Sequence, residues 1–143
     1  MFSLLFLLAC GPAELSTEDS SVATEECAML RGMQICNFEG IDESGESVVI
    51  ESLRGKPIVL DLSAMWCSPC VNAASQTQST AEALPNVTFL TVLIEDLTGQ
   101  KPDVEDILSW KNSNAIETAP VWGASRDLIT SNPIDVKDKF YLG

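Results

Sequence analysis

Cys67 and Cys70 are the residues of this chain whose type and spacing point most directly to chemistry. They come shortly after the apolar run IVLDL at residues 58–62. Two thiols spaced in this way at the start of a helix can close a disulfide, and the free N–H groups of the first turn favour a thiolate on the first sulfur. A thiolate is the attacking species in disulfide exchange. Since Pro69 also suits a first helical turn, the pattern predicts a redox pair at a strand-to-helix junction.

Two residues near the cysteine pair help to distinguish a redox site from a structural one. Asp61 lies inside the apolar run, where a buried carboxylate is costly and usually has a task or a partner. Trp66 directly precedes the first cysteine. A bare CxxC also fits a structural disulfide or half of a zinc site. The complete pattern, however, resembles the D-x-x-x-x-W-C-x-P-C motif of the thioredoxin superfamily, which runs along a strand, a loop and a helix start.

Residues 40–57, GIDESGESVVIESLRGKP, predict a β-hairpin with its turn at Ser44 and Gly45. A hairpin that leads into the cysteine-bearing strand is similar to membrane-anchored thioredoxin-like proteins of the TlpA/ResA type. The resemblance covers roughly residues 36–143. It implies an α/β thioredoxin-like fold with an N-terminal hairpin, a βαβ core and a mixed sheet flanked by helices.

One departure from that family lies just after the motif. Many members carry a glutamate three positions after the second cysteine and a proline two positions further on. This chain has Ala73 and Ser75 there. The acid–base tuning and partner choice that the family ties to the glutamate therefore do not carry over to this chain.

The remaining elements follow from the apolar pattern. Residues 67–83 predict a helix that ends before Pro85. The continuous apolar run at residues 87–94 predicts a parallel strand buried on both faces. Strand, helix and strand together form a right-handed βαβ unit. A second helix is expected at residues 103–112.

The C-terminal part allows two interpretations. The resemblance implies a cis-proline beside the CxxC pair, followed by an apolar strand, and Pro120 is one candidate for that proline. The letters VWGASRDL after it do not form a sustained apolar strand. The alternative is that Pro120 and Val121 match an earlier feature of the relatives, so that the last strands of the fold are missing from this chain.

Composition excludes several classes of function. A chain of 143 residues suggests one domain. The 21 acidic and 8 basic residues argue against nucleic acid as a partner and against electrostatic attraction to an anionic bilayer. The absence of histidine removes imidazole acid–base catalysis and imidazole metal ligands, which also counts against a copper carrier.

The N-terminus predicts secretion. Residues 1–10, MFSLLFLLAC, are too short to span a membrane and look like the apolar part of a signal peptide. Their last four residues resemble a bacterial lipobox, with Cys10 as the lipidated residue. No basic residue precedes Cys10, so the signal is atypical, the true start lies upstream, or the segment is a buried strand. Residues 11–26 are polar and acidic. Residues 11–35 are expected to be a flexible tether, and residues 36–143 the folded domain.

Five cysteines leave an odd number to be explained. If Cys10 carries lipid and Cys67 pairs with Cys70, then Cys27 and Cys36 remain and are expected to form a structural disulfide in an oxidising compartment. Two alternatives stay open. The last four cysteines could bind zinc, although the spacing of the first pair is unlike that of known zinc knuckles. The first pair could also exchange electrons with the second.

The predicted function is that of a thiol–disulfide oxidoreductase. Cys67 is expected to be the nucleophile and Cys70 the resolving thiol. Asp61 is expected to accept the proton of Cys70. Trp66 and Pro69 are expected to shape the surface on which substrates dock.

The expected partners are protein thiols or disulfides, an upstream electron donor and a lipid bilayer reached through lipid on Cys10, with no nucleic acid. No cofactor or metal is expected beyond the redox-active disulfide. The expected location is the bacterial cell envelope, on the periplasmic or extracytoplasmic side. The alternative function is a non-catalytic lipoprotein that keeps the fold and a static disulfide as a binding or structural module.

Overall fold

The structure, a computed structural model, describes Cys27 and residues 34–131. The expected signal segment, the lipidated Cys10 and most of the tether lie outside the described residues. None of the helices in this described part has the length and apolar character needed to cross a membrane.

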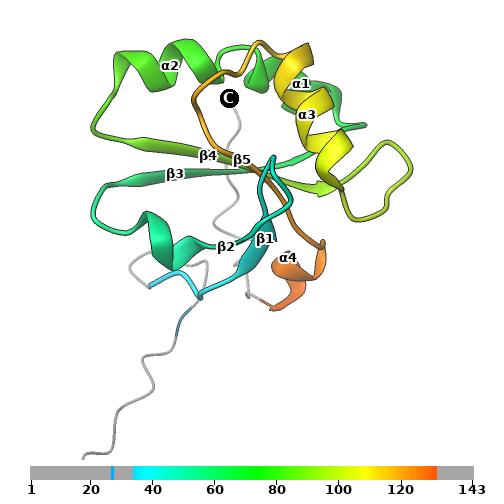
Figure 1. The fold of residues 1–143 in the computed structure, drawn as a ribbon, viewed down its shortest axis with the longest axis horizontal. Helices are drawn as coiled ribbons and strands as arrows, with labels where there is room; N and C mark the ends of the chain where they lie inside the picture. The colour runs from blue at the N-terminus through cyan, green and yellow to red at the C-terminus, as the bar shows by residue number, and fades with distance from the viewer. Residues whose placement is uncertain (1–26, 28–33, 132–143) are drawn as a thin grey trace, which may run out of the picture.

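The strands of the described residues form one mixed five-stranded sheet in the order β2-β1-β5-β4-β3. In chain order they are β1 (Glu39–Ile41), β2 (Ser47–Val49), the 3₁₀ helix η1 (Ile50–Leu53), β3 (Ile58–Ala64), α1 (Ser68–Ala74), α2 (Thr77–Ala83), β4 (Thr88–Glu95), α3 (Val104–Ser113), β5 (Val121–Gly123) and α4 (Asp127–Ser131). Figure 1 shows α1, α2 and α3 on one face of the sheet and η1 and α4 on the other. The predicted thioredoxin-like architecture is confirmed.

The predicted hairpin is formed by β1 and β2, which pair antiparallel. The Asp42 carboxylate accepts the backbone N–H groups of Ser44 and Glu46, at 2.8 and 3.1 Å, and so closes the turn. Gly45 has φ +82°, a conformation that other residues rarely adopt. The turn chemistry therefore fixes the hairpin register.

The βαβ unit is also present. Strands β3 and β4 pair in parallel, with Asp61 opposite Thr91 and Leu62 opposite Val92. Strand β4 lies between β3 and β5 and is buried along most of its length, which is why its sequence is a continuous apolar run. Strand β3 has only one neighbour among the described residues, and much of it is half-buried.

The single helix expected over residues 67–83 is instead two helices, α1 and α2. The Ser75 hydroxyl donates to the Asn72 carbonyl, and the Gln76 N–H donates to the Ala73 carbonyl three residues back. Such a bond tightens the last turn, and local serine bonds compete with a regular helix. The chain therefore ends one helix here and begins another.

The predicted second helix is α3. Asp103 caps its N-terminus: the Asp103 carboxylate accepts the Asp106 N–H, and the Asp106 carboxylate accepts the Asp103 N–H, each at 3.1 Å. This reciprocal pair satisfies two donors that the helix itself leaves free. The first turn of α3 is therefore fixed in place over the sheet.

Two apolar clusters, one on each face, hold the sheet in place, because alternate residues of a strand point to opposite faces. The cluster under α1, α2 and α3 comprises Ala74, Leu93, Ile107, Trp110, Ile116, Ala119 and Val121. The cluster on the other face comprises Phe38, Ile50, Leu90, Val92, Ile94, Trp122, Ala124 and Leu128. Strand β4 contributes to both clusters, and the carbonyl of its last residue, Glu95, accepts the Met65 N–H at 3.0 Å, two residues before Cys67.

Helix α2 is fastened to the loop before β5 by Gln78. The side-chain oxygen of Gln78 accepts the backbone N–H groups of Glu117 and Thr118, both at 2.9 Å, and of Ala119 at 3.5 Å. Its nitrogen donates to the Glu82 carboxylate and to the Thr118 hydroxyl. The Gln78 side chain thus provides an acceptor for backbone N–H groups that lie in a loop before β5.

Of the two interpretations of Pro120, the weaker one, a cis-proline beside the CxxC pair, is wrong. The described residues contain no cis peptide bond. Pro120 leads into β5, and its carbonyl accepts the Thr91 N–H of β4 at 3.1 Å. Because β4 separates β5 from β3, Pro120 lies on the far side of β4 from the cysteine-bearing strand.

Candidate functional site

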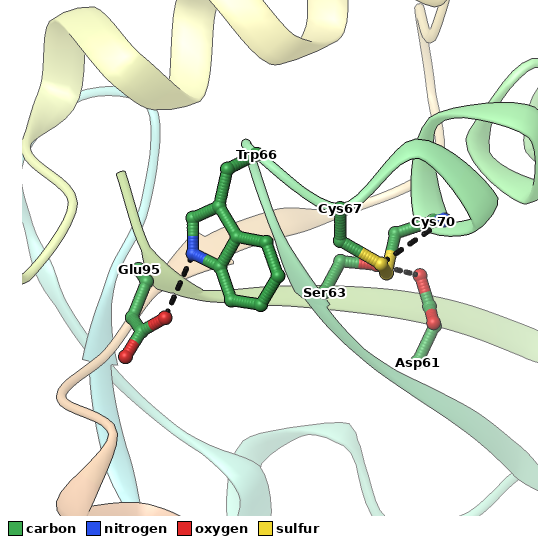
Figure 2. Close-up of a disulfide and its surroundings, with 6 residues drawn as sticks. All are labelled: Asp61, Ser63, Trp66, Cys67, Cys70 and Glu95. Atoms are coloured by element: carbon green, nitrogen blue, oxygen red, sulfur yellow. Dashed lines mark hydrogen bonds between the residues drawn. A yellow bond between two sulfur atoms is a disulfide. The ribbon is translucent and has the colours of Figure 1, made fainter. Parts of the chain in front are cut away.

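Cys67 and Cys70 are bonded to each other at the start of α1. Cys67 is the N-cap residue, with extended backbone, and its Sγ accepts the Cys70 N–H at 3.3 Å. Pro69 lies in the first turn, where its missing N–H costs nothing. Figure 2 shows the disulfide beside β3, next to the Ser63 side chain. The sulfur of Cys67 thus lies where helix N–H groups stabilise negative charge.

The two cysteines differ in what they touch. Both are half-buried. Cys70 packs against the cluster that contains Ala74 and Leu93, whereas Cys67 is not part of it. A sulfur that packs on the core is harder for a protein partner to reach, so Cys67 is the better placed for attack.

Asp61 and Ser63 lie on the same face of β3, two residues apart. The Ser63 hydroxyl donates to Asp61 Oδ2 at 2.7 Å. Figure 2 shows the Ser63 side chain beside the disulfide and the Asp61 carboxylate below it. Ser63 is 1% exposed and Asp61 is half-buried. Ser63 was not singled out from the sequence, although its place two residues after a strand carboxylate is the signal that could have found it.

Trp66 lies on the other side of the disulfide in the same view. Its side chain is 57% exposed, and its Nε1–H donates to Glu95 Oε2 at 2.8 Å. Glu95 is the last residue of β4 and is 8% exposed. The sequence interpretation missed Glu95. An acidic residue at the carboxyl end of a buried parallel strand was the available signal, since such ends converge at one edge of a sheet.

Arg126 completes this group. Its guanidinium forms an ion pair with Glu95 Oε1. The hydrogen bond from Arg126, followed by the one from Trp66, holds the pKa of Glu95 below its usual value. Glu95 is therefore an anion at neutral pH, and each of its oxygens has a donor.

The remaining described cysteines, Cys27 and Cys36, are bonded to each other. Cys27 is exposed and Cys36 half-buried, two residues before the core residue Phe38. The four-cysteine zinc site is not formed, because these cysteines lie in two separate disulfides. Throughout Cys27 and residues 34–131, no group of three or more His, Cys, Asp or Glu side chains could hold a metal ion.

The chain matches no protein-family model. It is 42% identical over 67 residues to thioredoxin H-type 2 of Nicotiana tabacum, which is 47% of this chain and 48% of that protein. It is 48% identical over 65 residues to thioredoxin H-type of Ricinus communis, which is 46% of this chain and 47% of that protein. The chain thus spans about half the length of these curated relatives.

Solved structures give the same fold. MTB DsbF, solved in mixed oxidized and reduced forms, is 26% identical with a TM-score of 0.53 over 66% of each chain. A secreted Mycobacterium tuberculosis disulfide oxidoreductase homologous to E. coli DsbE is also 26% identical, with a TM-score of 0.53 over 66% of this chain and 65% of that one. A thiol:disulfide interchange protein from Bacteroides sp. has a TM-score of 0.55 at 19% identity, covering 67% and 60% of the two chains. The described residues therefore form a thioredoxin-like domain that carries a CxxC disulfide at the end of its first parallel strand.

Proposed function

We propose that this protein is a thiol–disulfide oxidoreductase that exchanges disulfides with protein substrates outside the cytoplasm. The observation that carries the proposal is the Cys67–Cys70 disulfide at the N-terminus of α1, with the Asp61 carboxylate below it and the exposed Trp66 beside it. The two M. tuberculosis structures at 26% identity support it, since one is described as a secreted disulfide oxidoreductase.

The proposed reaction is a thiol–disulfide exchange in two steps. In the reduced protein, the Cys67 thiolate attacks one sulfur of a substrate disulfide, a mixed disulfide forms, and one substrate thiolate leaves. Asp61 takes the proton of Cys70, and the Cys70 thiolate then attacks the Cys67 sulfur. The second substrate thiolate leaves. Two electrons have passed to the substrate, whose thiolates take up protons, and the protein returns to the disulfide form. The reverse sequence oxidises a dithiol substrate.

The location is proposed from the N-terminal sequence. Cys10 would carry lipid after removal of residues 1–9, residues 11–35 would form a tether, and residues 36–143 the domain. Mass spectrometry of membrane-extracted protein should find residues 1–9 absent and a diacylglyceryl group on Cys10. An intact N-terminus in a protein free of membrane would contradict this part of the proposal.

An insulin-reduction assay tests the activity. The wild-type protein with dithiothreitol should accelerate insulin precipitation, and Cys67→Ser should abolish the acceleration. The matched control is the double variant Cys27→Ser, Cys36→Ser, which removes the other disulfide and should retain activity. A wild-type protein that gives no acceleration would favour the alternative, a non-catalytic binding or structural module with a static disulfide.

A further inference from the structure

Three segments that are distant in the sequence meet at one carboxylate. Trp66 follows β3, Glu95 ends β4, and Arg126 lies between β5 and α4. The indole N–H of Trp66 donates a hydrogen bond to Glu95 Oε2, and the guanidinium of Arg126 donates one to Glu95 Oε1. The two donors therefore bind different oxygens and do not compete. Glu95 thus joins the segment before α4 to the residue that precedes the first cysteine by polar contacts.

Burial shows why both donors are needed. The Glu95 side chain is 10% exposed, whereas that of Arg126 is 63% exposed. A carboxylate removed from water must be hydrogen-bonded or paired with a charge. The indole alone supplies one neutral donor. Arg126 supplies a charged donor that lowers the pKa of Glu95, and an ionised acceptor forms a stronger bond to the indole than a neutral one.

We propose that Arg126 is a positioning residue for the redox site: acting through Glu95, it holds the indole of Trp66 beside the Cys67–Cys70 disulfide and thereby sets how protein substrates dock. This inference rests on the proposed function. Trp66 directly precedes Cys67 and exposes more than half of its surface, so a docking partner would meet the indole first. Arg126 acts through its ion pair with Glu95, so its effect is indirect.

Three substitutions separate the effect of the Arg126–Glu95 ion pair from that of the Trp66–Glu95 hydrogen bond. Arg126→Met removes the ion pair and leaves the Glu95 carboxylate. Glu95→Gln keeps an oxygen that can accept from the indole but loses the charge, and Glu95→Leu removes both. Arg54→Met is the matched control, because Arg54 is also an exposed arginine in an ion pair, with Glu51 in η1.

The first measurement is the position of the indole. Trp110 and Trp122 are 3% and 4% exposed, so the readily exchanging indole N–H is expected to be that of Trp66. Trp66→Phe assigns its ¹H–¹⁵N resonance. Arg126→Met and Glu95→Leu should shift that resonance and speed its exchange with water, Glu95→Gln should do so less, and Arg54→Met should leave it unchanged.

The second measurement is the kinetics of insulin reduction. For Arg126→Met and Glu95→Leu, KM should rise about fivefold to tenfold while kcat changes less than twofold, because docking and not thiol chemistry is affected. Alkylation of Cys67 by iodoacetamide should keep its wild-type rate. A general loss of folding would instead lower kcat and alter alkylation.

Two failures can be told apart. A wild-type protein that does not reduce insulin would overturn the proposed function, and the docking role with it. An active wild type in which Arg126→Met leaves both the Trp66 resonance and KM unchanged would overturn the inference alone. If Glu95→Leu does not fold, Arg126→Met and Glu95→Gln still decide, since both keep a polar side chain at position 95.

Discussion

Ser63 donates its hydroxyl hydrogen to Asp61 at 2.7 Å, so the carboxylate below the disulfide is held by a neighbour on its own strand. The two side chains share the face of β3 that lies under α1. The oxygen bonded to Ser63 is fixed, and the carboxylate therefore keeps one orientation relative to the cysteines. Both predictions that follow depend on this pair.

Asp61→Asn should slow thiol–disulfide exchange near neutral pH by about tenfold or more, because an amide cannot accept the Cys70 proton. The same variant should melt at a higher temperature, since an amide oxygen can still accept from Ser63 without the cost of partly burying a charge. Insulin reduction and thermal denaturation check the two effects. Unchanged turnover together with unchanged melting would remove the acid–base role of Asp61.

Ser63→Ala should lower the free energy of unfolding by about 1 kcal/mol, because it leaves a half-buried carboxylate without its donor. Ser63→Thr keeps a hydroxyl and is the matched variant for the hydrogen bond. Urea denaturation compares them. If alanine and threonine give the same stability as serine, the bond does not stabilise the fold.

Cys67 should be alkylated before Cys70 when the reduced protein is treated at graded pH. The sulfur of Cys67 accepts a helix N–H and lies outside the apolar cluster against which Cys70 packs. Peptide mapping by mass spectrometry identifies the modified cysteine. Earlier modification of Cys70 would reverse the assigned roles.

The low pKa of Glu95 makes a prediction about acid stability. Its pKa is lowered in the folded protein from a usual value of 4.5. The unfolded chain therefore binds the proton first, and the stability due to Glu95 is present above about pH 4.5 and is lost as the pH falls through the lower folded pKa.

Glu95→Gln should accordingly be less stable than the wild type at pH 7, and the difference should shrink below pH 4.5. Denaturation across this range measures it. Glu46→Gln, at an exposed position in the hairpin turn, is the control and should show little change. A constant difference at every pH would mean that the ionisation of Glu95 is not coupled to folding.

The Cys27–Cys36 disulfide should be harder to reduce than the Cys67–Cys70 disulfide. It joins residues nine apart in the sequence and holds the segment that leads to the core residue Phe38. Its removal by Cys27→Ser and Cys36→Ser should cost about 2–3 kcal/mol of stability, from the loop-closure entropy of such a short ring. Titration with dithiothreitol, followed by alkylation, would contradict this if Cys27 and Cys36 are modified first.

Local patterns in the sequence were enough to predict much of this structure. The hairpin, the parallel strand β4 and helix α3 follow from turn residues, a continuous apolar run and spaced apolar residues, respectively. The break between α1 and α2 was missed, because it depends on the hydrogen bonds that Ser75 and Gln76 form and not on an apolar pattern.

In the candidate site, too, local patterns predicted only the residues that are close together in the sequence. The motif located Cys67, Cys70, Asp61 and Trp66, since these residues are close in the sequence. Glu95 and Arg126 could not be assigned to Trp66, because their contacts depend on strand order and register. The sequence left two interpretations of Pro120 open for the same reason: only the pairing of β5 with β4 shows where Pro120 lies in the sheet.

Gln78 gives the molecule a folding constraint. Its side chain bonds the N–H groups that precede β5, so α2 and the entry to β5 must form together. Amide hydrogens of Glu117 and Thr118, although they lie in an exposed loop, should then exchange with solvent only when α2 opens. The helix that follows the redox motif and the strand on the far side of β4 thus belong to one cooperative unit, and the exchange rates of these loop amides report on the stability of both.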